Sequence, residues 1–137
     1  MRLSIALAVV VVICAPAAIA AGALYPKQDC NRAETQMDLN QCAEANYEAA
    51  DAALNALYKR LLAQDTDAKA AASLRDAERT WISYRDKECA RQVGPREGGG
   101  SIWPMDMSTC LEEKTAARIR ELKQSLDCPA GPNACPE

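Results

Sequence analysis

Cysteine content is the feature that most constrains how this chain folds, because seven cysteines occur among its 137 residues. So many cysteines in a short chain indicate either disulfide bonds or a thiolate metal site. The chain contains no histidine, which excludes Cys/His metal sites and every nucleophilic arrangement that relies on a histidine base. No CxxC motif occurs either, so we expect structural disulfides, with no metal and no cofactor.

The N-terminal segment indicates the compartment in which these cysteines are found. Arg2 precedes an apolar run from Leu3 to Ala15, and Ala18-Ile19-Ala20 fits the small-x-small rule for cleavage. This pattern is typical of a secretory signal peptide over residues 1–20, and Pro16 leaves the run too short for a transmembrane helix. We therefore expect a periplasmic or secreted protein that is not stably inserted in a membrane after cleavage.

Cleavage of the signal peptide changes both the cysteine count and the charge. Cys14 follows Val12 and Ile13 rather than small residues, so a lipoprotein is not expected. Removal of Cys14 and Arg2 leaves six cysteines, with 19 acidic residues against the remaining basic ones and a formal charge of −4. An acidic chain of this kind does not suit nucleic acid, and it favours a cationic protein partner.

Three segments have apolar residues spaced three and four apart, which is the pattern of amphipathic helices. They run from about Asp38 to Ala63, from about Asp67 to Gln92 and from about Ser108 to Leu126. The chain has no Phe and much Ala, so the expected core is poor in bulky side chains and needs crosslinks. The expected apolar stripes are Leu39, Cys42, Tyr47, Ala50, Leu54, Leu57, Tyr58 and Leu61; then Leu74, Ala77, Trp81, Tyr84 and Cys89; then Leu111, Thr115, Ile119, Leu122 and Leu126.

The predicted fold is all-α: a small antiparallel bundle of three main helices, stabilised by disulfides. Residues 21–34 form an N-terminal arm, residues 35–126 the helical domain and residues 127–137 a Pro-rich C-terminal tail. A Gly- and Pro-rich loop over residues 94–106 separates the second helix from the third. Proximity in the chain and this helix layout favour three disulfides, namely Cys30–Cys42, Cys89–Cys110 and Cys128–Cys135.

Two helices carry polar residues close to their apolar stripes. Paired carboxylates such as Asp51 and Asp86, or Glu88, are used for acid–base catalysis in many enzymes. Charged groups between helices also need partners, and a network of this kind would fix how the helices meet. We favour a structural polar network over catalysis, formed by Asp51, Asn55, Tyr58, Trp81, Arg85 and Asp86.

The Gly-rich loop is the other candidate site, and we interpret it as a surface that binds a partner. It lacks the preceding strand and the Lys-Ser/Thr pair of a phosphate-binding loop. Its apolar side chains either fold back over the helix ends as a lid or remain exposed as a binding anchor. The candidate partner-binding residues are Gly99, Gly100, Ser101, Ile102, Trp103, Met105 and Asp106.

Three ordered blocks of the chain resemble the LprI-type lysozyme-inhibitor domain of bacterial envelopes. The blocks run from Thr35 to Tyr58, from Trp81 to Cys89 and from Gly99 to Leu122, so the resemblance covers nearly the whole chain after the signal peptide. It implies a small exported helical domain with disulfides that protects the cell wall by binding lysozyme. Cys128 and Cys135 fall outside the three blocks.

Resemblance and composition together predict a lysozyme-binding inhibitor that is not an enzyme. An inhibitor needs no catalytic group, which agrees with a chain that lacks histidine. We expect the loop around Ser101 to Asp106 to block the lysozyme cleft, while carboxylates of the first and third helices steer the encounter. The alternative is an envelope interaction or structural module with a partner other than lysozyme, and a carboxylate-based glycan hydrolase is the least favoured possibility.

Overall fold

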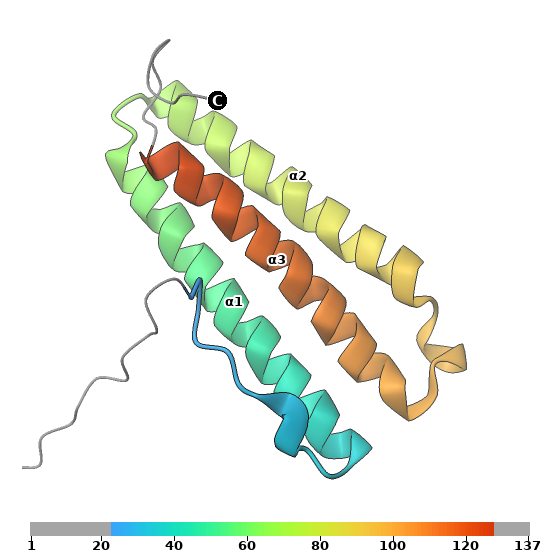
Figure 1. Cartoon of the computed structure of the whole chain (residues 1–137). Helices are drawn as coiled ribbons and strands as arrows, with labels where there is room; N and C mark the ends of the chain where they lie inside the picture. The colour runs from blue at the N-terminus through green and yellow to red at the C-terminus, as the bar shows by residue number, and fades with distance from the viewer. Residues whose placement is uncertain (1–22, 128–137) are drawn as a thin grey trace, which may run out of the picture.

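The computed structural model describes residues 23–127, and three long helices make up most of this part of the chain. These helices are α1 (Gln36–Gln64), α2 (Ala68–Val93) and α3 (Trp103–Asp127). Three short 3-10 turns complete it: η1 (Cys30–Arg32) in the arm, and η2 (Arg96–Gly98) and η3 (Gly100–Ile102) in the loop before α3. Successive helices run antiparallel (Figure 1), so the all-helical fold and the three-helix bundle are confirmed. The predicted signal peptide, Cys14 and the predicted Cys128–Cys135 disulfide lie outside the described residues.

Side-chain caps determine where the first two helices begin. Thr35 and Asp38 form a capping box at the start of α1, in which the Asp38 amide donates to Thr35 Oγ1 at 3.1 Å and the Thr35 amide donates to Asp38 at 3.0 Å. The bond from Thr35 also lowers the pKa of Asp38. At the start of α2, the Asp67 carboxylate accepts hydrogen bonds from the amides of Lys69 and Ala70. The predicted break at residues 65–67 is therefore a true helix boundary.

The third helix begins earlier than the sequence pattern predicts. It starts at Trp103 rather than near Ser108, so the last four residues of the predicted loop, 103–106, belong to α3. Pro104 is compatible with this start because the amides of a first helical turn have no partner within the helix. The carboxylate of Asp106 in the same turn suits the positive end of the helix dipole.

The apolar core lies between α1 and α3, which share the largest interface in the bundle. Its centre consists of Leu54 and Leu57 from α1 with Ile119 and Leu122 from α3. Since α2 runs antiparallel to both, α1 and α3 are parallel to each other. They lie side by side, with α3 between α1 and α2 (Figure 1). The main packing of the fold thus joins two helices that are not consecutive in the chain.

The second helix packs on the bundle through a different kind of surface. Its buried residues are Ala71, Glu78, Arg85 and Cys89, so two of the four are charged. The predicted apolar stripe of this helix was wrong at Ala77 and Tyr84, which are exposed. The inward face of α2 is instead occupied by Glu78 and Arg85, which directly follow Ala77 and Tyr84 in the chain. Both charged side chains have partners on the other helices.

Two disulfides connect the helices to the segments beside them. Cys30–Cys42 joins the arm to the first turns of α1, with a Cα–Cα distance of 5.8 Å. Cys89–Cys110 joins the end of α2 to α3, with a Cα–Cα distance of 5.7 Å. Both are pairings that the sequence favoured, and both close short loops, of 12 and 21 residues in sequence separation.

We expect loss of either disulfide to destabilise the protein by a similar amount but at different places. Each loop closure is worth about 3 kcal/mol by chain entropy. The Cys89→Ala/Cys110→Ala variant should therefore unfold about 3 kcal/mol more easily in denaturant, and amide hydrogen exchange should accelerate mainly in α2. The Cys30→Ala/Cys42→Ala variant is the matched comparison, with faster exchange in the arm. Equal acceleration in all helices of both variants would contradict this division.

Candidate functional site

Arg85 is the centre of a polar network where all three helices meet. Its residue is only 6% exposed. The guanidinium lies 2.9 Å from Asp86 of its own helix, while Nη1 lies 3.4 Å from both the Asp51 carboxylate of α1 and the Thr115 hydroxyl of α3. Asn55 donates to the second carboxylate oxygen of Asp51 at 2.8 Å, which extends the network along α1.

Aromatic rings cover the same guanidinium. The Arg85 guanidinium carbon lies 5.2 Å from the centre of the Trp81 ring and 5.5 Å from the centre of the Tyr47 ring, within the range of cation–π contacts. A second cation, Arg118 of α3, lies 5.7 Å from the centre of the Trp81 ring. Burial against this network raises the pKa of Tyr47.

The network contains most of the residues that the sequence suggested, together with two others. Asp51, Asn55, Trp81, Arg85 and Asp86 come together, whereas Tyr58 is half-buried and its hydroxyl makes no hydrogen bond to a residue of the described part. Tyr47 and Thr115 were missed as members. Both stood in the predicted apolar stripes, and only the placement of Arg85 on another helix shows that they serve as its partners.

A second set of ion pairs joins α2 and α3. Its Glu78 lies two turns from Arg85 on α2, and its Arg118 lies one turn from Thr115 on α3. Arg118 donates through Nε and Nη2 to one oxygen of Glu78, at 3.1 and 2.9 Å, and through Nη1 to Glu121 at 2.9 Å. Burial alone would lower the pKa of Arg118, but its bonds to Glu121 and Glu78 outweigh burial and raise it. Glu78 is buried with only 8% of its side chain exposed, and Arg118 is the cation that offsets the cost of burying it.

The N-terminal arm is attached to the bundle by a buried carboxylate. Glu112 of α3 is 4% exposed and accepts a hydrogen bond of 2.6 Å from the Tyr25 hydroxyl, and the Lys27 ammonium lies 2.6 Å from the same oxygen. Burial and this bond to Glu112 raise the pKa of Tyr25. Gln28 and Asn46 add two hydrogen bonds between the arm and α1, at 2.7 and 3.2 Å.

The loop before α3 folds back on itself through Trp103. The indole nitrogen of Trp103 donates to the Gly94 carbonyl at 3.0 Å, and the Arg96 guanidinium carbon lies 5.5 Å from the centre of the indole ring. Gly99 lies so close to the indole that a side chain there would collide with it. Gly100 has a φ of +60°, a backbone conformation that favours glycine. Of the two alternatives for the apolar side chains of this loop, Trp103 therefore follows the first: it folds back as part of a lid and is not an exposed anchor.

Two exposed apolar side chains mark the same end of the bundle, which we call the tip. Ile102 of the loop is 44% exposed, and Met37 in the first turn of α1 is 68% exposed. Hydrogen bonds fix the loop to α1 between them, because the Asn40 amide donates to the Ser101 carbonyl at 2.9 Å and the Gln36 amide lies 3.8 Å from the Met105 sulfur. We define the tip as Met37, Ser101, Ile102 and Met105 with the exposed carboxylates Asp38 and Asp106.

The three carboxylates that the sequence offered for acid–base chemistry are all bound by basic or amide side chains. Asp51 and Asp86 are both paired with Arg85, and Glu88 is bound by Arg91 and Gln92, which lowers the pKa of Glu88 to about 2. Within residues 23–127, no group of three or more His, Cys, Asp or Glu side chains is placed to hold a metal ion.

Comparison with known proteins agrees with this description. The model of a family described as lysozyme inhibitor LprI matches residues 27–122, a segment that includes both disulfides, the Arg85 network and the tip. An uncharacterized protein of Rhizobium meliloti (strain 1021) is 43% identical over 119 residues, covering 78% of this chain and 85% of that protein. No solved structure matches the chain.

The Arg85 network leads to a stability prediction. Arg85→Met keeps an apolar stem of similar length but removes the charge that Asp51 and Asp86 share. Both carboxylates are partly exposed and can be rehydrated, so we expect a loss of about 2 kcal/mol in the free energy of unfolding, measured in urea, rather than the larger cost of a fully buried pair. Arg79→Met, which breaks an exposed pair with Asp76, is the control and should change stability little. Equal stability of both variants would refute the central position of Arg85.

The arm leads to a prediction of pH dependence. Because the pKa of Tyr25 is raised in the folded protein, the unfolded chain ionises first as the pH rises past the ordinary tyrosine value of 10.0. The stability that Tyr25 contributes is fully present below that pH and is lost as the pH rises through the folded value. Tyr25→Phe should lower the free energy of unfolding by about 1 kcal/mol at neutral pH. The difference between the native protein and this variant should shrink in alkaline urea titrations, and a difference that grows there would contradict the assignment.

Proposed function

Since the chain belongs to the LprI lysozyme inhibitor family, we propose that it binds lysozyme outside the cytoplasm and protects the cell wall by covering the lysozyme cleft. Lysozyme cleaves glycosidic bonds with a pair of carboxyl groups in a cleft that must admit the glycan. A protein that occupies this cleft needs shape and rigidity, and it needs no catalytic group of its own.

The tip is the surface that we assign to lysozyme, and its exposed apolar pair is the observation that supports this assignment. Ile102 and Met37 are among the few large apolar side chains exposed in the described part of the chain, and they lie at one end of the bundle. Apolar side chains at the centre of an interface carry much of its binding energy. The six-residue stretch from Ser101 to Asp106 remains the proposed contact region. Within it, Trp103 packs inward and supports the exposed residues.

Rigidity of the tip favours a blocking role. The Cys89–Cys110 disulfide closes the base of the loop, Trp103 bonds to the Gly94 carbonyl, and Asn40 holds the Ser101 carbonyl. A loop that is already ordered loses little conformational entropy when it binds, so more of the contact energy appears as affinity. The exposed carboxylates Asp38 and Asp106 beside it supply a negative field that steers a cationic partner toward this end.

Compartment evidence agrees with such a partner. Two disulfides indicate an oxidising environment outside the cytoplasm. Over residues 23–127, none of the helices has the length and apolar character needed to cross a bilayer. Export through the predicted signal peptide would bring the protein to the space where lysozyme attacks the cell wall.

The tip can be tested by its two exposed apolar residues. Ile102→Ala combined with Met37→Ala should weaken the inhibition of lysozyme about tenfold or more, read as clearing of a cell-wall suspension, because apolar anchor surface is removed without disturbing the core. Ile82→Ala on α2, which is 41% exposed in the native protein, is the matched control and should inhibit like the native protein.

Two outcomes of this assay would overturn the proposal at different levels. If the native protein leaves lysozyme active, lysozyme is not its partner, and an interaction module of the envelope with another partner becomes the better description. If the native protein inhibits and the tip variant inhibits equally well, lysozyme is bound but the contact surface lies elsewhere. Clearing by the protein alone would instead indicate glycan hydrolysis.

A further inference from the structure

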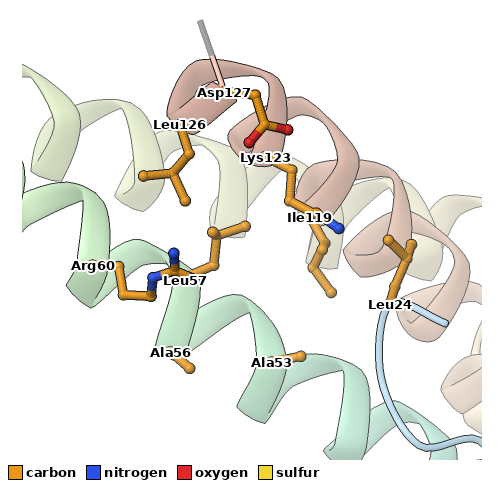
Figure 2. Close-up of a pocket in the computed structure, with 9 residues that line it drawn as sticks. All are labelled: Leu24, Ala53, Ala56, Leu57, Arg60, Ile119, Lys123, Leu126 and Asp127. Atoms are coloured by element: carbon orange, nitrogen blue, oxygen red, sulfur yellow. The ribbon is translucent and has the colours of Figure 1, made fainter. Parts of the chain in front are cut away.

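A groove opens at the end of the bundle opposite the tip, where α1, α3 and the arm meet (Figure 2). Its volume is about 310 Å³, which is within the size range of small-molecule sites. Apolar side chains form its walls and charged side chains its rim. The apolar lining consists of Leu24, Ala53, Ala56, Leu57, Ile119 and Leu126.

The hollow exists because α1 presents small residues where α3 presents large ones. Leu57 and Ile119 pack into the core and are almost completely buried, so they form the floor of the groove. Ala53 and Ala56 lie beside them on α1 and fill little of the space toward Leu126 (Figure 2). An apolar surface that the fold leaves open in this way gains free energy when another apolar group covers it.

Two cationic side chains at the rim of the groove set a second requirement for its ligand, which is a negative charge. Arg60 of α1 and Lys123 of α3 line the groove, and neither forms an ion pair with any residue of the described chain. This distinguishes them from Arg85 and Arg118, whose charges are paired within the bundle. Asp127 is the one acidic group in the lining, so two cations face a single carboxylate. The excess favours an anionic group at the rim.

The occupant is best supplied from outside the exported chain, because the apolar residues 3–15 belong to the predicted signal peptide. The ten residues that follow Asp127 contain no Leu, Ile, Val, Met or aromatic residue, so they offer no large side chain for the apolar floor. A second copy related by a two-fold axis would bring the two rims together, with four cations against two carboxylates, so an excess of positive charge would remain between the copies. A single apolar chain with a negative head satisfies both the floor and the rim.

We propose that this groove binds a free single-chain anionic amphiphile of the fatty-acid type. The alkyl chain lies on Leu57 and Ile119, between the alanines of α1 and Leu126, and the carboxylate stays at the rim with Arg60 and Lys123. Burial of methylene groups supplies the affinity, and the cations select the charged head. The site is separate from the tip and does not depend on lysozyme binding.

The test uses the oxidised protein without the predicted signal peptide (residues 1–20) and dodecanoate below the concentration at which it forms micelles, with binding measured by isothermal titration calorimetry. We expect one dodecanoate per chain. Ala56→Leu fills the mouth of the groove with a good helix former and should weaken binding about tenfold or more. Arg60→Gln/Lys123→Gln removes the cations and should weaken binding by a similar factor, while thermal melting shows that both variants remain folded.

Charge alone is controlled by Arg75→Gln/Lys87→Gln on α2, which removes two exposed cations that do not line the groove and should bind dodecanoate like the native protein. Absence of saturable binding would overturn the proposal. So would equal affinity of the groove variants and this control, because the ligand would then lie elsewhere. Equal affinity for dodecan-1-ol would refute the anionic head. If sedimentation shows a dimer that Ala56→Leu dissociates, the groove belongs to a second copy of the chain. If dodecanoate binds only after residues 128–137 are deleted, the groove belongs to the chain itself.

Discussion

The buried charge of Arg85 is the constraint on which the arrangement of the three helices depends. A guanidinium that is 6% exposed costs several kcal/mol unless acceptors surround it, and those acceptors come from all three helices. α2 has few large apolar residues facing inward, so its position is fixed by charges that must meet their partners rather than by a continuous hydrophobic stripe. A shift of α2 by one turn would separate Arg85 from Asp51 and Thr115 together. The network therefore sets the register of α2 against the α1–α3 pair.

That register carries through to the tip. Cys89 follows Arg85 by one turn on α2, and its disulfide to Cys110 places the end of α2 against the beginning of α3. Gly94 ends α2 with a positive φ of 81°, and its carbonyl is the acceptor for Trp103. The geometry of Ile102 thus depends on a chain of fixed contacts that begins in the polar network. In an inhibitor, such a chain replaces the catalytic apparatus of an enzyme, because the shape of the surface is what the partner recognises.

The sequence predicted well the features that depend on local spacing. Helical periodicity placed α1 and α2 nearly to their ends, and proximity favoured both disulfides of the described part. The start of α3 was missed because Pro104 and the preceding glycines resemble a loop, although a first helical turn accepts proline. Glu78 was missed as a buried residue because periodicity counts apolar side chains, and the partner that allows its burial, Arg118, lies 40 residues away. Features that need two distant segments at once, including the groove between α1 and α3, cannot be read from spacing within either one.

The two ends of the bundle differ for a physical reason that follows from the parallel packing of α1 and α3. Both helices begin at the tip, so their positive dipole ends coincide there and the first-turn carboxylates Asp38 and Asp106 compensate them. Both helices end near the groove, where their negative dipole ends coincide, and Arg60 and Lys123 each stand about one turn before the end of their helix. Charges that suit helix dipoles therefore place carboxylates at the tip and cations at the groove rim. The proposed cationic protein partner would meet the carboxylates of the tip and the proposed anionic ligand would meet the cations of the rim, so both proposals follow from the parallel packing of α1 and α3.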